Sequence, residues 1–118
     1  MIYEGNEMSQ LLVRGRPINI DPEGFLTDLT EWDETVAEVI AKTEGIILTP
    51  DHWQVIRFLR GFYQEYQIAP AIRILVKALR DTLGPEKGNS IYLHTLFPDG
   101  AAKQSNKIAG LPKPTRCI

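Results

Sequence analysis

The chain of 118 residues is 43% hydrophobic and 24% charged, which is enough for one compact domain whose core needs no disulfide or metal. Its single cysteine excludes an internal disulfide, and one cysteine with two histidines is too few for a zinc site. No apolar run approaches the length of a membrane span, and "MIYEGNEMSQ" lacks the basic and apolar regions of a signal peptide. We therefore expect a cytoplasmic protein that uses no membrane and no cofactor.

The first elements of the chain are predicted to be extended. The stretch "LLVRGRPINI" reads as two short strands around Arg14-Gly15-Arg16. The stretch "DPEG" at 21–24 is a turn that leads into Phe25-Leu26, because proline and glycine supply the backbone angles that a turn requires. These patterns predict a small hairpin near the N-terminus.

Two helices are predicted in the next segment. The first, "TEWDETVAEVIAKTEG", has Thr30 or Asp33 as its N-cap and ends at Gly45. The second, "TPDHWQVIRFLRGFYQEY", begins with Thr49 as its N-cap and Pro50 at the first helical position. It is predicted to be the central helix because of its broad apolar stripe of Trp53, Ile56, Leu59, Phe62, Tyr63 and Tyr66.

Three shorter helices complete the predicted body. "PAIRILVKALRDTLG" is expected to begin at Pro70 and to end at Gly84. "NSIYLHTLFP" predicts a short helix that Pro98 ends, and "AAKQSNKIAG" predicts a last helix up to Gly110. The expected fold is mainly α, a small helical domain with a short N-terminal β-hairpin and an extended, mobile C-terminal arm.

The chain changes character after Gly110. Pro112 and Pro114 cannot continue a helix, so residues 111–118 are expected to form a semi-stiff arm with Cys117 near its tip. A cysteine kept for packing is expected inside a helix or strand, whereas this one is the penultimate residue. Cys117 is therefore the candidate reactive residue, an exposed thiol on a projecting arm.

The reactivity of that thiol depends on the charges around it. Residues 98–118 carry four basic side chains against Asp99 alone, while residues 1–97 carry nine basic side chains against fourteen acidic ones. Arg116 and Lys113 favour the thiolate and the terminal carboxylate disfavours it, so we expect strong activation only when the arm docks on a basic surface. Two groups of basic residues have spacings that place each group on one helix face: Arg57 with Arg60, and Arg73 with Lys77 and Arg80. These groups either line such a groove or are the solvated faces of two amphipathic helices.

Two further interpretations of the polar residues stay open. His52 and His94 are possible bases, but each is flanked by large apolar residues in a predicted helix, which favours a surface or core-edge position. The helices around "QIA" also fit a helix-turn-helix that contacts phosphates through Arg73, Lys77 and Arg80. A sequence pI near 5.7 argues against a large phosphate footprint, and nucleic-acid binding leaves Cys117 unexplained.

The segments "TPDHWQVIRFLRGFYQEYQIAPAIRILVKAL" and "GPEKGNSIYLHTLFPDGAAKQSNKIAGLPKPTRCI" resemble the DsrC/TusE family of sulfur-relay proteins. The resemblance covers residues 12–118 and includes the terminal "KIAGLPKPTRCI" with its penultimate cysteine. Residues 1–11 differ from the family and read as a variable extension. The resemblance implies a helical domain at 12–110 and a mobile arm at 111–118 that carries the reactive thiol, Cys117.

The resemblance also distinguishes between types within the family. DsrC proper has a second cysteine in the arm, at the position that Asn106 occupies in this sequence. The chain therefore resembles the one-cysteine, TusE-like type, a sulfurtransferase that acts as a persulfide carrier within a relay. This type takes sulfur from a TusBCD/DsrEFH-type complex and passes it to the thiouridylase of tRNA 2-thiouridine synthesis. The alternative that the resemblance leaves open is a partner or regulator of sulfite reductase in sulfur oxidation.

Overall fold

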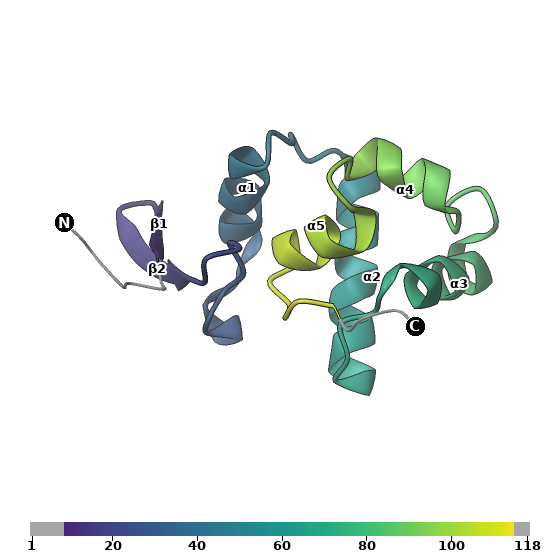
Figure 1. The fold of residues 1–118 in the computed structure, drawn as a ribbon, viewed down its shortest axis with the longest axis horizontal. Helices are drawn as coiled ribbons and strands as arrows, with labels where there is room; N and C mark the ends of the chain where they lie inside the picture. Colours follow the sequence, from purple (N-terminus) through teal and green to yellow (C-terminus); the bar gives the residue numbers. More distant parts are fainter. Residues whose placement is uncertain (1–8, 115–118) are drawn as a thin grey trace.

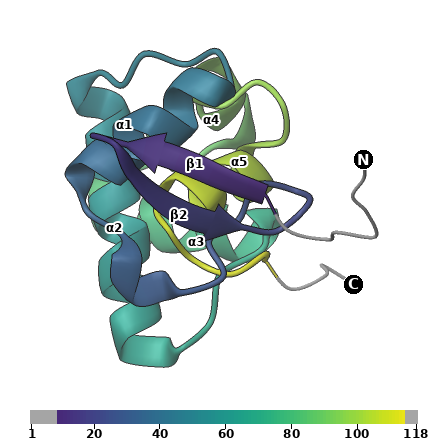
Figure 2. The ribbon, with the colours of Figure 1, turned by 90° about the vertical axis from the view of Figure 1, so that its left-hand side faces the viewer.

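The computed structural model describes residues 9–114, and the chain begins there with a β-hairpin. Strand β1 (Ser9–Val13) pairs antiparallel with β2 (Arg16–Ile20), with Val13 opposite Arg16. The turn residues Arg14 and Gly15 have φ values of 52° and 78°, as in the type I′ turn whose twist matches that of the flanking strands. The predicted hairpin is confirmed, and Figure 2 looks directly onto it.

Helices α1 (Glu34–Thr43) and α2 (Pro50–Tyr66) begin at side-chain caps. Asp33 caps α1, since its Oδ1 accepts a hydrogen bond of 2.8 Å from Val36 N. Thr30, the other predicted cap, lies instead in a short 3-10 turn at Leu29–Glu31. Thr49 caps α2 with Pro50 as the first helical residue, as the sequence predicts.

Helices α3 (Ile72–Leu83), α4 (Ser90–Leu96) and α5 (Ala101–Ile108) follow. The prediction that Pro70 begins the third helix is wrong by two residues. The N-cap of α3 is Ala71, so Pro70 lies before the helix. A proline fits this position as well as the first helical position, so it does not by itself mark where the helix begins. Gly84 ends α3 with a φ of 98°, as predicted.

Helix α5 lies at the centre of the molecule, between α1 on one side and α2 and α4 on the other (Figure 1). Seven of its eight residues are buried, and Lys103 is the exposed one. The apolar core around it includes Phe97, Ile108 and the inward residues of the other helices. The segment that follows α5 therefore leaves from the middle of the domain rather than from a frayed end.

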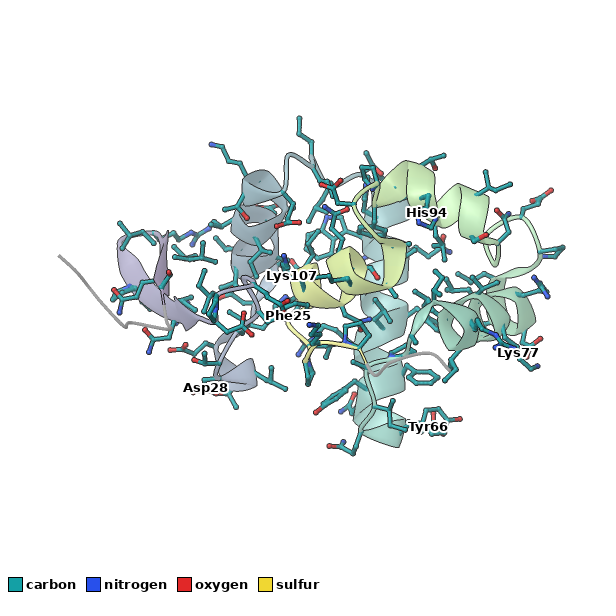
Figure 3. The ribbon with its side chains drawn as sticks, viewed as in Figure 1. Phe25, Asp28, Tyr66, Lys77, His94 and Lys107 are labelled. Carbon is teal, nitrogen blue, oxygen red and sulfur yellow. The ribbon has the colours of Figure 1, made fainter. Side chains whose placement is uncertain are left out.

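The apolar stripe predicted for α2 is only partly correct. Ile56 and Leu59 are fully buried, but Tyr66 is 54% exposed at the end of the helix, where Figure 3 shows it pointing away from the body. Val55, which the predicted stripe does not include, is buried. Across residues 9–114, the structure has no helix that is both long and apolar enough to cross a membrane.

Candidate functional site

The candidate site is the base of the carboxyl-terminal segment, because Cys117 itself lies outside the described residues. Two backbone hydrogen bonds form this base: Gly110 N donates to Lys107 O at 3.1 Å, and Leu111 N donates to Asn106 O at 3.0 Å. This pair of bonds is the Schellman motif, which satisfies carbonyl groups that the end of a helix leaves without partners. It also turns the chain sharply, so the direction in which the segment leaves α5 is defined by backbone geometry.

Gly110 occupies a position that only glycine fits. Its φ is 74°, in the left-handed region where a side chain is strained. A Cβ atom at this position would lie 2.2 Å from Cδ1 of Trp32, so the glycine backbone packs directly on the indole ring. Leu111, the next residue and the first of the predicted arm, is also buried in the core. The chain is therefore held tightly through Leu111.

Trp32 and Arg60 bind the end of α5 from two different segments of the chain. Trp32 Nε1 donates to Ile108 O at 2.9 Å, and Arg60 Nη1 donates to Ala109 O at 2.7 Å. The guanidinium of Arg60 also lies 3.8 Å from the centroid of the Trp32 ring, a cation–π contact. Burial lowers the pKa of Arg60 below its ordinary value, but the group stays charged because an arginine pKa starts far above neutral. A positive charge here also complements the negative end of the α5 dipole.

Beyond Leu111, an ion pair connects the chain to the turn after the hairpin. Lys113 Nζ lies 3.0 Å from Oε1 of Glu23, and Lys103 Nζ lies 3.8 Å from the other oxygen of that carboxylate. The hydrogen bond from Lys113 lowers the pKa of Glu23, with smaller contributions from the charges of both lysines. The Lys113–Glu23 pair is solvent-exposed, so it contributes little to the stability of the fold.

A second ion pair is formed inside the body. Lys107 is nearly buried, and its Nζ donates to Oε2 of Glu44 at 3.1 Å while lying 5.4 Å from the centroid of the Phe25 ring (Figure 3). Gln104 Nε2 donates to the other Glu44 oxygen at 2.9 Å. Burial raises the pKa of Glu44, but the hydrogen bonds from Gln104 and Lys107 outweigh it, so the pKa lies below its ordinary value. This network fixes α5 against α1.

The two predicted groups of basic residues line separate grooves. Arg57 and Arg60 line a groove of about 630 Å³ whose walls also include Trp32, Tyr63 and Leu111, so it lies beside the base of the arm. Arg57 is paired with Glu34 at 3.6 Å, which reduces the positive charge there. The other group, on α3, lines a second groove beside the start of α4.

Both histidines have structural partners. His52 is buried; its Nδ1 accepts a 3.0 Å hydrogen bond from Thr49 N, and its Nε2 donates to Leu96 O at 2.8 Å. His52 thus takes the place of the usual glutamate in a capping box and connects α2 to α4. His94 is exposed, and its Nδ1 lies 2.8 Å from Ser90 O. The predicted core-edge and surface positions are confirmed.

Asn106, at the position of the second cysteine in DsrC proper, is completely buried. Its Nδ2 donates to Pro70 O at 3.1 Å and to Ala102 O at 2.8 Å, while its Oδ1 has no hydrogen-bond partner among residues 9–114. The side chain therefore connects α5 to the α2–α3 loop. Within residues 9–114, no three His, Cys, Asp or Glu side chains lie close enough together to hold a metal ion.

The sequence does not indicate that Trp32 and Arg60 hold the base of the arm. Their side chains bind backbone carbonyl groups, which carry no residue identity and so leave no pairing pattern in the sequence. The sequence signal at this site is Gly110, because a glycine directly after a helix indicates that the helix ends in a left-handed turn.

The DsrC-like protein family matches residues 12–118 of this chain. The chain is 56% identical over 108 residues to sulfurtransferase TusE of Escherichia coli strain K12, covering 92% of this chain and 99% of that protein. It is 59% identical over 104 residues to sulfurtransferase TusE of Pectobacterium atrosepticum, covering 88% of this chain and 95% of that one.

Solved structures give the same result for the fold. Allochromatium vinosum DsrC is 51% identical with a TM-score of 0.86, covering 94% of this chain and 99% of that one. The oxidized γ-subunit of the dissimilatory sulfite reductase (DsrC) from Archaeoglobus fulgidus is 44% identical with a TM-score of 0.80, covering 93% and 100%. The hairpin, the central α5 and the anchored exit after it therefore define a small helical domain with the DsrC fold. The chain belongs to the DsrC-like family.

Proposed function

We propose that this protein is a one-cysteine sulfur carrier that accepts sulfur as a persulfide on Cys117 and relays it to a partner. The upstream partner is a TusBCD/DsrEFH-type sulfur-transfer complex, and the downstream partner is the thiouridylase that makes 2-thiouridine in tRNA. The protein acts as a sulfurtransferase in the cytoplasm, as one step of a relay rather than as an independent enzyme. The observation that carries the proposal is a single cysteine placed six residues beyond an anchored exit at Leu111.

The loading step is an exchange between a thiol and a persulfide. The Cys117 thiolate attacks the outer sulfur of a donor cysteine persulfide, the sulfur–sulfur bond of the donor breaks, and the donor cysteine leaves as a thiolate. One bond forms and one breaks, so no external oxidant or reductant is needed. The sulfur then sits on Cys117 and is transferred in the same way at the next partner. The step needs no general base from this chain, and both ring nitrogens of His52 are already engaged by Thr49 N and Leu96 O.

The described residues support a carrier role through the arm base. A transferred sulfur must reach the reactive groups of two partners in turn, which requires a thiol that projects from a fixed point. The Schellman turn and the contacts of Trp32 and Arg60 supply the fixed point. Pro112 and Pro114 then stiffen the chain beyond it, which lowers the entropy lost when the arm enters a partner.

A second function has its own support. The solved relatives include the γ-subunit of dissimilatory sulfite reductase, so a DsrC-like role as a partner or regulator of that enzyme is the alternative. Asn106 excludes the intramolecular arm disulfide of DsrC proper in this chain, but a regulator that only docks its arm needs no such disulfide. The relatives named as sulfurtransferases align over nearly their whole length, which favours the relay.

The test is mass spectrometry of the intact protein after incubation with a cysteine desulfurase, cysteine and the upstream complex. The expected result is a mass increase of one sulfur atom that dithiothreitol removes, and that is absent from Cys117→Ser. The melting temperature of Cys117→Ser is expected to equal that of the wild type, which shows that the loss is chemical. Sulfur found on the donor complex but never on this chain would leave only the regulatory function.

A further inference from the structure

The groove beside α3 has a charge pattern that the relay chemistry does not use. It has a volume of about 450 Å³. Its lining residues are Ile72, Arg73, Val76, Lys77, Arg80 and Ser90. Three of these are cations and none is a carboxylate, and the spacing of the three cations places them on one face of α3. Figure 3 shows Lys77 on the outer side of α3, at the end of the molecule away from the hairpin.

The charges of this groove are poorly neutralised by the protein itself. Most lysines and arginines within residues 9–114 have a carboxylate within ion-pair distance, but Arg73 and Arg80 have none in that range. Lys77 pairs at 3.1 Å with Asp81, a turn further along the same helix. The groove is therefore a local positive surface on a chain whose net charge is −2.

The shape of the groove is built into the fold. Arg80 Nε donates to Gly88 O at 3.3 Å, which connects this side chain to the α3–α4 loop. A Cβ atom at Gly88 would lie 2.2 Å from Arg80 N, so only glycine lets the α3–α4 loop approach this closely. The site thus exists before any ligand binds.

The groove also has apolar surface. Ile72 and Val76 are half-buried in its lining, and Ile91, which follows Ser90 in the chain, is 79% exposed. An occupant therefore gains by covering aliphatic side chains as well as by neutralising cations. A nucleic-acid backbone supplies only the second of these contributions, which favours a polypeptide.

We propose that the α3 groove is a docking site for a partner protein, and that it takes an acidic segment of that partner with interspersed aliphatic residues. The protein's own arm is the wrong occupant, because Lys113 and Arg116 are basic and Lys113 already pairs with Glu23. This groove shares no lining residue with the groove beside Leu111, so the two are separate sites. This proposal does not depend on persulfide formation at Cys117.

The test is an NMR titration of the 15N-labelled full chain with a capped peptide of alternating glutamate and leucine. Chemical-shift changes are expected at the amides of Arg73, Val76, Lys77 and Ser90. The combined variant Arg73→Glu with Arg80→Glu should weaken the affinity about ten-fold, because two exposed attractions become repulsions. The control variant is Arg14→Glu with Lys42→Glu, which changes the net charge by the same amount. These two cations also lack an ion-pair partner among the described residues. The affinity of this variant for the peptide is expected to change by less than about two-fold.

Five outcomes would overturn the proposal. The first is an absence of binding, and the second is a set of shift changes on another face. The third is equal binding of a peptide with glutamine in place of glutamate, and the fourth is an equal loss of affinity in the control variant. The fifth is a stronger response of the same amides to single-stranded oligouridylate with a steep salt dependence, which would assign the groove to nucleic acid. Circular dichroism of both variants ensures that any loss is measured on folded protein.

Discussion

The guanidinium of Arg60 lies 3.8 Å from the centroid of the Trp32 ring, and the two side chains donate hydrogen bonds to consecutive carbonyl groups, Ile108 O and Ala109 O. Each side chain holds the other in place, and together they complete the hydrogen bonding at the end of α5. Residues from before α1 and from the middle of α2 therefore determine where the carboxyl-terminal segment begins. The point at which this segment leaves α5 depends on the packing of the whole domain rather than on α5 alone.

The indole hydrogen bond can be tested by Trp32→Phe, which keeps an aromatic ring but leaves Ile108 O without its donor. We expect a loss of about 1 kcal/mol in the free energy of unfolding. The matched control is Trp53→Phe, because Trp53 also has an arginine near its ring, at 5.4 Å, but makes no side-chain hydrogen bond within residues 9–114. Urea unfolding followed by circular dichroism measures both. Equal losses in the two variants would show that the bond to Ile108 O contributes nothing.

Gly110→Ala tests the close contact with Trp32. Gly45 provides the control, since its φ of 77° is nearly the same as the 74° of Gly110 but a Cβ atom there meets nothing within 4 Å. Gly45→Ala is expected to cost about 1 kcal/mol of stability from backbone strain. Gly110→Ala should cost about 1–3 kcal/mol more, because the ring of Trp32 has to move. If thermal unfolding gives the same shift for both, Gly110 is only a turn residue and the ring contact is not tight.

Amide hydrogen exchange locates the point at which the chain leaves the body. Among residues 111–114 only Leu111 and Lys113 carry a backbone N–H. The Leu111 amide donates to Asn106 O, whereas the Lys113 amide has no hydrogen-bond partner among the described residues. We expect Leu111 to be protected together with α5 and Lys113 to exchange at nearly the rate of an unstructured peptide. Fast exchange at Leu111 in the wild type would show that the Schellman turn opens freely.

Local patterns were sufficient to predict most of the elements. The hairpin, the Thr49-Pro50 start of α2 and the end of α3 at Gly84 each depend on a few adjacent residues with defined backbone preferences. The predicted Pro70 start of α3 was wrong because a proline fits both the position before a cap and the first helical position. Cap, turn and proline residues of this kind predict where a helix or strand begins and ends, but they do not predict which other elements it packs against.

The central position of α5 was not predictable in this way. Its sequence, "AAKQSNKI", reads as a polar surface helix, yet Gln104, Asn106 and Lys107 are buried. Their partners are Glu44 and the carbonyl oxygens of Pro70 and Ala102, and two of these three groups lie far away in the sequence. Burial of polar residues is favourable only when such distant partners are in place, so the sequence pattern around them is uninformative.

The ion pair of Glu44 predicts a pH dependence of stability. The pKa of Glu44 is lower in the folded protein than its ordinary value of 4.5, so its stabilising contribution is present above pH 4.5 and is lost as the pH falls through the lower folded-state pKa. Glu44→Gln is expected to reduce the free energy of unfolding by about 1–2 kcal/mol at neutral pH. That difference should shrink steadily as the solution is acidified.

The matched control for this prediction is Glu38→Gln on the same helix, an exposed carboxylate with no ion pair within the described residues. Its effect on stability at neutral pH should be small, because an exposed carboxylate without an ion pair contributes little. Urea unfolding at a series of pH values measures both variants. A difference between wild type and Glu44→Gln that stays constant into acid would mean that the charge of Glu44 is not what stabilises the network with Gln104 and Lys107.

Asn106→Cys tests whether the arm is able to fold back on the body. A disulfide with Cys117 needs the two Cα atoms about 4.4–6.8 Å apart, which an extended arm does not satisfy, so the chain must bend at Gly110. In the structure Asn106 is fully buried and Gly110 is packed against Trp32, so we expect the bend to require opening of the last turn of α5. The disulfide should therefore form slowly, form faster in low concentrations of urea, and block sulfur loading until it is reduced.

The measurement for Asn106→Cys is the intact mass with and without a thiol-alkylating reagent, followed over time after addition of an oxidant. An intramolecular disulfide leaves a monomer with no alkylated thiol. Once formed, it lowers the entropy of the unfolded chain, which for a loop of this size stabilises the folded protein by about 3 kcal/mol before strain at Pro112 and Pro114 is subtracted. Adding Gly110→Ala to this variant should change the rate of closure, because the packing of residue 110 on Trp32 controls the opening. Products that are only intermolecular dimers, with the thiol introduced by Asn106→Cys still free, would show that the arm does not return to the body and that residue 110 is not its hinge.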